Sequence, residues 1–270
     1  MARPVVCFDL DGTLIDPAAS PGSSIHPEDI LMLAQADPPA LFIPATGRSR
    51  GSVRRTFAEN GLFEGQQIPL PLVLQNGALL YLPGEVEAAY FPFSRPVQEG
   101  LIRLAADFPQ ITFLLLSKEL IHLLNPNSFG LEAVQKYEFA VQDFDPSSQV
   151  AYSKVMCISN HPEALASVAQ AGQRLPVEGA YSMPSIFEFN PRGVSKASGV
   201  IMLLEKMGLA GSLYFAAGDG DNDRVLLESA RLAFAPSSSS PEIRQLADYV
   251  LDGSQGGLLG QMLGIIEKYV

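Results

Sequence analysis

Two acidic residues at the end of a short apolar run are the first candidates for chemistry in this sequence. Asp9 and Asp11 follow directly on the run 4–8, which has the composition of a strand buried on both faces of a parallel sheet. Ligands of such sheets bind beyond the carboxyl ends of the strands. Two carboxylates there repel each other unless a cation lies beside them, and hard oxygen ligands favour Mg²⁺ over Zn²⁺. The pair therefore predicts a magnesium site at this strand end.

A second set of polar residues follows the next predicted strand, at 40–45. Thr46, Gly47 and Arg48 would place a hydroxyl group and a glycine N–H at the end of that strand, where they can hold a phosphoryl oxygen. Lys196 stands at the start of a predicted helix, and its ammonium group can offset phosphate charge. Each signal is weak alone, because a Thr-Gly pair is commonly only a turn and most lysines are solvated.

A third acidic segment, GDGDND at 218–223, follows the apolar run 213–217. It supplies Asp219, Asn222 and Asp223 at another predicted strand end. A calcium EF-hand loop is excluded, because neither this segment nor the one from Asp9 has the pattern of an EF-hand, with glycine at the sixth position and glutamate at the twelfth. The segment therefore adds carboxylates to the same edge of the predicted sheet.

Composition and charge narrow the possible partners. The chain has 270 residues, of which 47% are hydrophobic, so a sizeable core can form. Its net charge is −11, which disfavours binding to nucleic acid or to an anionic membrane surface. No apolar run approaches the ~18 residues of a membrane span and no secretory signal is recognisable, so we expect a cytoplasmic protein. Cys7 and Cys157 lie in apolar runs and are expected to be buried free thiols.

The order of predicted elements indicates an α/β protein with an insertion. Short apolar runs alternate with helical patterns in the N-terminal part, where a third run at 71–74 continues the expected parallel sheet. Paired strands fill the middle of the chain, and the alternation then returns. We therefore predict a doubly wound, mostly parallel, Rossmann-like core sheet over 1–82 and 188–270, with an inserted α+β domain over 83–187.

Taken together and in this order, these segments resemble the motifs of the haloacid dehalogenase superfamily. Residues 9–13 look like its first motif, 46–48 like its second, Lys196 like its third and 218–223 like its fourth. The insertion lies between the second and third motifs, which is similar to the C2-capped, Cof-like branch of phosphatases. The resemblance thus implies that the inserted domain is a cap of the C2 type.

The resemblance also implies a role for each motif residue. Asp9 would be the nucleophile that forms a phosphoaspartyl intermediate, and Asp11 the general acid and then the general base. The third catalytic residue would be Lys196. Phosphate would be held by Thr46, Gly47, Arg48, Lys196 and Asn222. Mg²⁺ would be held by Asp9, the backbone carbonyl of Asp11, and Asp219, with Asn222 and Asp223 positioning ligands or waters.

The implied activity is Mg²⁺-dependent hydrolysis of small phosphorylated metabolites, such as sugar phosphates or phosphorylated cofactors, by a monomer or homodimer. Two alternatives stay open: a phosphomutase with the same core, and a non-catalytic ligand-binding regulator. A dinucleotide-binding domain is disfavoured because the turn after the first strand is not G-x-G-x-x-G. Zinc hydrolysis is disfavoured because no two of the three histidines have metal-ligand spacing.

The position of the insertion suggests that the cap covers the site and selects the leaving group. Its candidate contacts are polar residues in or beside apolar runs: Arg95, His122, Asn125, Asn127 and Lys154. Glu188 and Asn190, near the return to the core, are stronger candidates.

Overall fold

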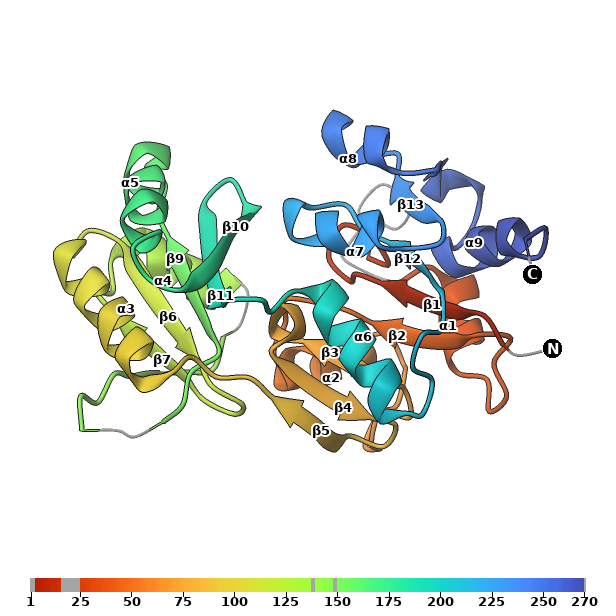
Figure 1. Ribbon diagram of the computed structural model, residues 1–270, viewed down its shortest axis with the longest axis horizontal. Coiled ribbons are helices and arrows are strands. Elements are labelled where there is room, and N and C mark those ends of the chain that lie inside the picture. Colours follow the sequence, from red (N-terminus) through yellow and green to blue (C-terminus); the bar gives the residue numbers. More distant parts are fainter. Residues whose placement is uncertain (1–2, 16–24, 137–138, 148–149, 270) are drawn as a thin grey trace. The chain divides into compact units, whose positions relative to one another are not determined.

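The computed structural model describes residues 3–15, 25–136, 139–147 and 150–269 (Figure 1). The chain forms two compact units. The core unit comprises Met1–Ala88 and Ser195–Val270, and the inserted unit comprises Ala89–Val194.

The core unit is built on a five-stranded parallel sheet with the order β14-β13-β12-β1-β2. The strands are β1 (Val5–Phe8), β2 (Leu41–Pro44), β12 (Tyr214–Ala217), β13 (Ala233–Pro236) and β14 (Tyr249–Leu251). Every residue of β1, β12 and β13 is buried, which accounts for their unbroken apolar sequences. The carboxyl ends of β1, β2 and β12 therefore meet at one edge of the sheet.

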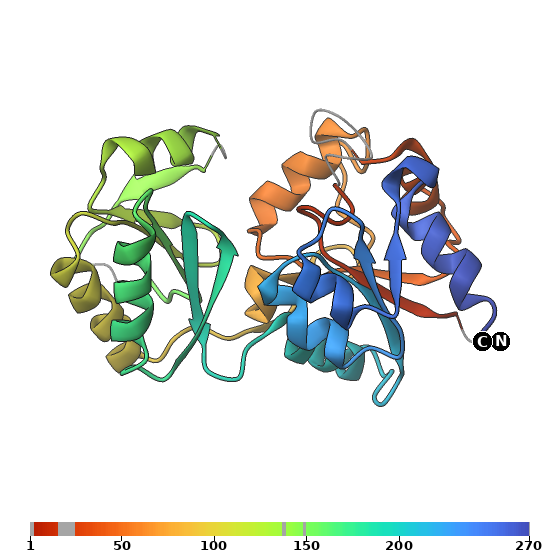
Figure 2. The ribbon, with the colours of Figure 1, turned by 90° about the horizontal axis from the view of Figure 1, so that it is seen from above.

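Helices cover both faces of this sheet (Figure 2). One face carries α1 (Pro27–Leu33), α2 (Arg50–Glu59) and α9 (Leu258–Ile266), and the other carries α6 (Lys196–Lys206), α7 (Arg224–Glu228) and α8 (Pro241–Leu246). Helices on both faces of a parallel sheet define a doubly wound α/β fold, so the predicted fold class is confirmed.

The apolar run predicted at 71–74 is a strand, but it does not extend the parallel sheet as expected. β3 (Leu72–Leu74) pairs antiparallel with β4 (Leu79–Leu82), and β5 (Val86–Tyr90) completes a separate three-stranded sheet. A single bridge, Ala45 to Val73, links β3 to the end of β2. The short 3₁₀ turn η1 (Gln75–Gly77) folds the chain straight back into this hairpin, while the other edge of β3 meets the end of β2 through that bridge, which is parallel.

The inserted unit has a six-stranded sheet with the order β10-β11-β9-β6-β7-β8, antiparallel except for the pair β7 and β8. Its strands are β6 (Thr112–Leu116), β7 (Ile121–Leu124), β8 (Val141–Asp143), β9 (Lys154–Ile158), β10 (Val177–Met183) and β11 (Ile186–Pro191). Helices α3 (Arg95–Asp107) and α5 (Pro162–Gly172) pack on one apolar cluster, and α4 (Ser128–Lys136) packs on the other. This is the α+β insertion expected from the sequence.

The boundaries between the two compact units lie at 88/89 and 194/195. Both come later in the chain than the predicted boundaries at 82/83 and 187/188. β5 pairs with the sheet of β3 and β4, which belong to the core unit. β11 lies between β9 and β10 and hydrogen bonds to both, so a boundary at residue 188 would cut through a central strand of the inserted sheet. Among the described residues, no helix is long and apolar enough to cross a membrane.

Candidate active site

Asp9 is the first residue beyond β1, and its backbone continues the pairing of that strand with β12. Its N–H donates to the Ala217 carbonyl oxygen at 3.0 Å, which places Asp9 beside the loop that starts at Gly218. Asp9 is only 5% exposed. Two segments more than two hundred residues apart in sequence thus deliver their acidic side chains to the same strand ends.

Lys196 is fixed at the first turn of α6. Ser195 caps this helix: its hydroxyl accepts a hydrogen bond from Ser198 N, and its own N–H donates to Ser198 Oγ. Gly77 has φ +100°, and a Cβ there would lie 2.1 Å from the Ser195 carbonyl oxygen, so only glycine permits this close approach. The η1 turn and the start of α6 therefore pack tightly together, which fixes the backbone position of Lys196.

The ammonium group of Lys196 is fully buried between two carboxylates. Its Nζ lies 2.9 Å from Asp9 Oδ1 and 2.7 Å from Asp223 Oδ1. Burial lowers the pKa of Lys196, but the Asp223 and Asp9 carboxylates outweigh this effect and hold the pKa above its ordinary value. Lys196 is therefore charged at neutral pH.

Asp223 also organises the loop that carries Asp219. Its Oδ2 accepts hydrogen bonds from Asp219 N at 3.2 Å and Gly220 N at 3.1 Å, while Oδ1 accepts from Lys196. A Cβ at Gly218 would lie 2.5 Å from Asp223 Cβ, so the loop has no room for a larger residue there. Both Asp223 oxygens are thus engaged by the chain itself.

Asp219 faces the loop that follows β1. Its Oδ1 accepts a hydrogen bond from Thr13 Oγ1 at 2.7 Å. Gly12 has φ +78°, and a Cβ there would lie 2.3 Å from Asp219 Oδ2, so glycine is required. Burial and the charge of Asp223 raise the pKa of Asp219 to about 6, against the lowering effects of Thr13 and Lys196.

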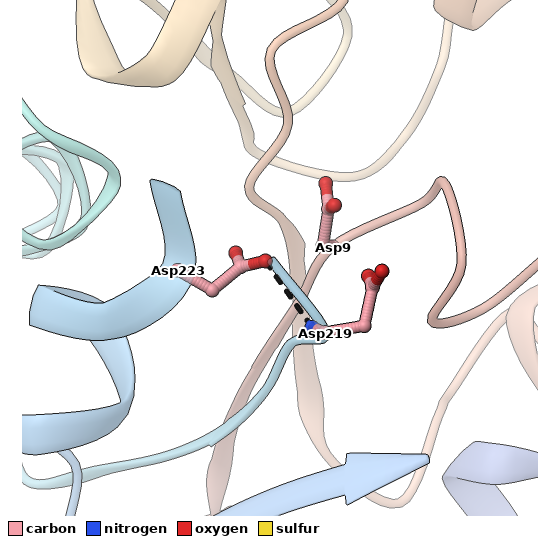
Figure 3. Close-up of side chains that lie close together, drawn as sticks. All are labelled: Asp9, Asp219 and Asp223. Carbon is pink, nitrogen blue, oxygen red and sulfur yellow. Dashed lines mark hydrogen bonds between the residues drawn. The ribbon is translucent and has the colours of Figure 1, made fainter. Parts of the chain in front are cut away.

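Asp9, Asp219 and Asp223 form a cluster that suits a divalent cation (Figure 3). One oxygen from each lies within 4.8 Å of the others. Burial and the three neighbouring acids, Asp223, Asp219 and Asp11, hold the pKa of Asp9 well above its ordinary value, although Lys196 lowers it. Such crowded carboxylates gain from a further positive charge, and an all-oxygen donor set fits Mg²⁺.

The side chain of Asp11 is engaged elsewhere. It pairs with Arg48 through two hydrogen bonds, from Nε to Oδ2 at 2.7 Å and from Nη2 to Oδ1 at 2.6 Å. Arg48 also contacts the hydroxyl groups of Ser52 and Thr56. Of the four acids assigned to the metal site, then, the structure brings the side chains of Asp9, Asp219 and Asp223 together and pairs that of Asp11 with Arg48.

The second motif lies at the end of β2, next to this cluster in the sheet. Thr46 is fully buried; its Oγ1 accepts a hydrogen bond from Arg48 N at 3.2 Å, and its carbonyl accepts one from Asn76 N at 3.0 Å. Asn76 Oδ1 in turn accepts a hydrogen bond from Asn222 Nδ2 at 3.4 Å. The Thr46 and Asn222 segments are thus connected through Asn76.

Four further residues of the site lay outside the sequence-based assignment of roles: Thr13, Ser52, Thr56 and Asn76. A signal existed for two of them. Ser52 and Thr56 are four residues apart in α2, so their side chains fall on one helical face, and Arg48 stands a further four residues before Ser52, just ahead of this helix. Nothing in the local sequence distinguishes Asn76 as a contact of Asn222.

The candidate leaving-group contacts of the inserted unit divide into two groups. Asn125 and Asn127 have structural contacts: Asn125 Nδ2 donates to the Ala105 carbonyl at 2.6 Å, and Asn127 Oδ1 accepts from Gly130 N at 2.8 Å in the first turn of α4. Arg95 is exposed and pairs with Glu99.

The other group is buried. Lys154 on β9 and Glu188 on β11 form an ion pair of 2.8 Å. Asn190 Nδ2 donates to the Ser153 carbonyl at 3.2 Å, and His122 contacts the Tyr152 hydroxyl. Lys154, Glu188 and Asn190 lie on one face of the inserted sheet, whereas His122 lies on the opposite face with Leu115 and Val155. Each of the four has its partner within the inserted unit.

Comparisons with known proteins show the family of this chain. The family model of the haloacid dehalogenase-like hydrolases matches residues 6–257. A putative phosphatase of Mycoplasma pneumoniae is 24% identical over 271 residues, covering 90% of this chain and 89% of that protein. A phosphoglycolate phosphatase of Natronomonas pharaonis is 26% identical and covers 92% of this chain and 91% of its own. A phosphoglycolate phosphatase of Methanopyrus kandleri is 34% identical over 70 residues, only 30% of its length.

Solved structures share the fold over nearly the whole chain. A haloacid dehalogenase-like hydrolase from Bacillus subtilis has a TM-score of 0.79 at 20% identity, covering 96% of this chain and 99% of its own. A Thermotoga maritima protein has a TM-score of 0.77 at 21% identity, with 95% of each chain covered. Because the family model spans most of the sequence, the chain belongs to the haloacid dehalogenase-like hydrolases, as the order of its motifs predicted.

Proposed function

We propose that this protein is a Mg²⁺-dependent phosphatase of small phosphomonoesters that works through a phosphoaspartyl intermediate on Asp9. The observation that carries the proposal is the buried ammonium group of Lys196 between Asp9 and Asp223, with Asp219 beside them. Carboxylates at a strand end repel a phosphate dianion unless positive charge offsets them. Lys196 provides one such charge, and the carboxylate cluster suits a cation of the Mg²⁺ type.

Asp9 and Asp219 are the side chains best suited to hold Mg²⁺, together with the Asp11 carbonyl that the family resemblance implies. Asp223 is better suited to hold Lys196 and the loop, because both of its oxygens already accept hydrogen bonds. When bound, the ion would neutralise phosphoryl charge and so allow a carboxylate to approach phosphorus.

In the first half of the reaction, an oxygen of Asp9 attacks phosphorus and the bond from phosphorus to the leaving oxygen breaks. Asp11 gives a proton to the departing alkoxide, which leaves as an alcohol. Thr46, the Gly47 N–H and Lys196 hold the oxygens that do not react, and Asn222 helps to position them. Fixed donors of this kind stabilise the charge that develops in phosphoryl transfer.

In the second half, a water molecule attacks the phosphorus of the acyl phosphate. Asp11, now a carboxylate, takes the proton from this water, and the bond between phosphorus and Asp9 breaks. Inorganic phosphate leaves, and Asp9 returns as a carboxylate. A phosphomutase would instead return the phosphoryl group to a sugar hydroxyl.

We further propose that the inserted unit is the cap and that it selects the leaving group. The relatives support a small metabolite as substrate, because their names include phosphoglycolate phosphatase and 5-amino-6-(5-phospho-D-ribitylamino)uracil phosphatase. Both of these substrates contain a phosphomonoester, but the remainder of the two molecules differs. We therefore expect the core, which the relatives share, to bind the phosphoryl group, and a more variable part of the chain to bind the remainder of the substrate.

Release of inorganic phosphate from a panel of phosphorylated metabolites at fixed Mg²⁺ tests this proposal. We expect Asp9→Asn to abolish turnover with an unchanged melting temperature, and Asp11→Asn to be nearly as damaging. Asp221→Asn is a matched control, because Asp221 lies in the same loop but is exposed and pairs with Arg224. Wild-type turnover by Asp9→Asn would refute the assignment of the nucleophile, and isomerised sugar phosphate without release of phosphate would indicate a mutase.

Metal removal gives a separate test. We expect EDTA to stop turnover and added Mg²⁺ to restore it, because three acids and one lysine leave the cluster with excess negative charge. Undiminished turnover after exhaustive dialysis against EDTA would contradict the role of the cation.

A further inference from the structure

We infer that Arg48 is a positioning residue that fixes the Asp11 carboxylate, and not a ligand of the phosphoryl group. This inference rests on the proposed function and departs from the expectation, drawn from the second motif, that Arg48 binds phosphate.

The guanidinium group of Arg48 is almost fully committed within the protein. Nε and Nη2 make two parallel hydrogen bonds to the carboxylate of Asp11, at 2.7 and 2.6 Å. Nη1 contacts Ser52 Oγ at 3.3 Å and also Thr56 Oγ1. An arginine side chain has five N–H donors, so these four contacts leave about one donor for anything else. Arginine commonly binds a phosphoryl group through two parallel donors, and one remaining donor cannot provide that geometry.

The surroundings of Arg48 are those of a fixed support. Its own N–H donates to Thr46 Oγ1 at 3.2 Å, and its carbonyl accepts a hydrogen bond from Gln75 N at 3.1 Å. Ser52 and Thr56 follow at intervals of four residues and belong to one face of α2, whose first turn is capped by the Ser49 hydroxyl. The helix therefore holds the guanidinium group, and the guanidinium group holds Asp11.

Asp11 needs such a support because its own segment is a tight turn. Gly12 follows with φ +78°, and the turn closes through Gly12 N to the Ile15 carbonyl at 3.1 Å. The Asp11 side chain is 44% exposed, so packing alone does not fix its rotamer. A planar fork with two parallel bonds fixes both the position and the plane of a carboxylate, which a single ammonium group cannot do.

The consequence concerns the departure of the leaving group. If Arg48 acts through Asp11, its loss should slow the hydrolysis of esters whose leaving group needs a proton. The hydrolysis of esters whose leaving group needs no proton should change little. Binding of the phosphoryl group itself should be unaffected. A phosphate ligand would behave in the opposite way, because its loss weakens phosphate binding whatever the leaving group.

The test compares Arg48→Gln and Arg48→Lys with wild type in kcat/KM, which reports the steps up to departure of the leaving group. The substrates are p-nitrophenyl phosphate and an alkyl phosphomonoester that the wild type hydrolyses. We expect a loss of about 100-fold for the alkyl ester and under about 10-fold for the aryl ester. The dissociation constant of inorganic phosphate with Mg²⁺, measured by calorimetry, should stay within about two-fold of wild type.

Two further variants complete the design. Thr56→Val removes one acceptor of the guanidinium group at constant shape, so it should show the same alkyl-selective loss on a smaller scale even if Arg48→Gln does not fold. Arg231→Gln is the charge-matched control, since Arg231 is exposed and precedes β13, at the opposite edge of the sheet from the site. It should behave as wild type.

Equal losses for both esters, or phosphate binding weakened by about ten-fold or more, would overturn the inference while leaving the proposed phosphatase intact. A wild-type protein that binds phosphate but hydrolyses neither ester would refute the proposed function, and the role of Arg48 with it.

Discussion

Lys196 carries its charge inside the protein because two carboxylates face it. Replacing it by methionine keeps the volume but leaves Asp9 and Asp223 buried without their shared cation. Removing one partner from a buried ion pair typically costs about 3–5 kcal/mol. We expect Lys196→Met to lower the free energy of unfolding at pH 7 by about 3 kcal/mol in urea titrations. Phosphatase activity should fall by about 100-fold or more.

A double variant separates the two effects. Lys196→Met combined with Asp223→Asn removes one of the two unpaired charges, so part of the lost stability should return while activity stays low. Recovery of activity along with stability would mean that Lys196 acts only by holding the fold, and not on the phosphoryl group.

At the scale of single residues, strand ends were the most useful feature of the sequence. Asp9 and Asp219 each follow a buried apolar strand, and parallel strands bring such ends together. The pairing of Asp11 with Arg48 could not be predicted in the same way. It depends on the course of the turn at Gly12 and on the rotamer of a long side chain, neither of which leaves a periodic pattern.

Among the elements, α1 and α9 form a contact that joins distant parts of the core unit. Asp29 of α1 is fully buried and accepts hydrogen bonds from Leu258 N at 2.8 Å and Leu259 N at 2.9 Å, in the first turn of α9. Glu28 accepts one from Gly257 N at 2.9 Å. Side chains of one helix thus supply the N-terminal cap of another.

This contact makes stability depend on pH. Burial raises the pKa of Asp29 to about 6, although the N–H groups of Leu259 and Leu258 lower it. A carboxyl group whose pKa is higher in the folded state stabilises the fold when protonated, so stability falls as pH rises through about 4 to 6. We expect the difference in unfolding free energy between wild type and Asp29→Asn to drop by about 2 kcal/mol from pH 4.5 to 7.

Urea titrations of both proteins at the two pH values measure this difference. A difference that grows with pH would show that the helix N-terminus holds Asp29 ionised and that burial is the weaker effect. Leu31→Ala is a control, because Leu31 is a highly exposed residue of α1. It should have the same pH dependence as wild type.

Long helices with a strong apolar pattern could be predicted from the sequence, whereas short strands could not. From the sequence we expect helices at about 96–108 and at 161–171, and α3 and α5 begin and end within about a residue of these limits, because their apolar faces recur at helical spacing. Strand β14 was not expected, since its three residues include the exposed Val250 and give no apolar run. Strand β3 was expected to extend the parallel sheet, but it pairs along its length with β4 and meets the end of β2 at a parallel bridge, because an apolar run does not specify pairing.

For the whole molecule, net charge opposes the substrate. The chain carries −11, so its long-range field repels a phosphate dianion, whereas Lys196 acts only at short range. Salt screens the long-range part first, because the Debye length is about 10 Å at 0.1 M. We therefore expect kcat/KM for a dianionic ester to rise about two-fold from 10 to 150 mM KCl at fixed free Mg²⁺. A steep fall over this range would show that net attraction guides the substrate.

If the phosphoryl group passes through Asp9, it can be trapped on that residue. Asp11→Asn should still accept a phosphoryl group from ³²P-labelled p-nitrophenyl phosphate, because that leaving group needs no proton, but it should fail to activate water. After acid quench, we expect about one label per protein in the peptide that contains Asp9. Nitrophenol released without any label on the protein, or label on a peptide that lacks Asp9, would contradict it.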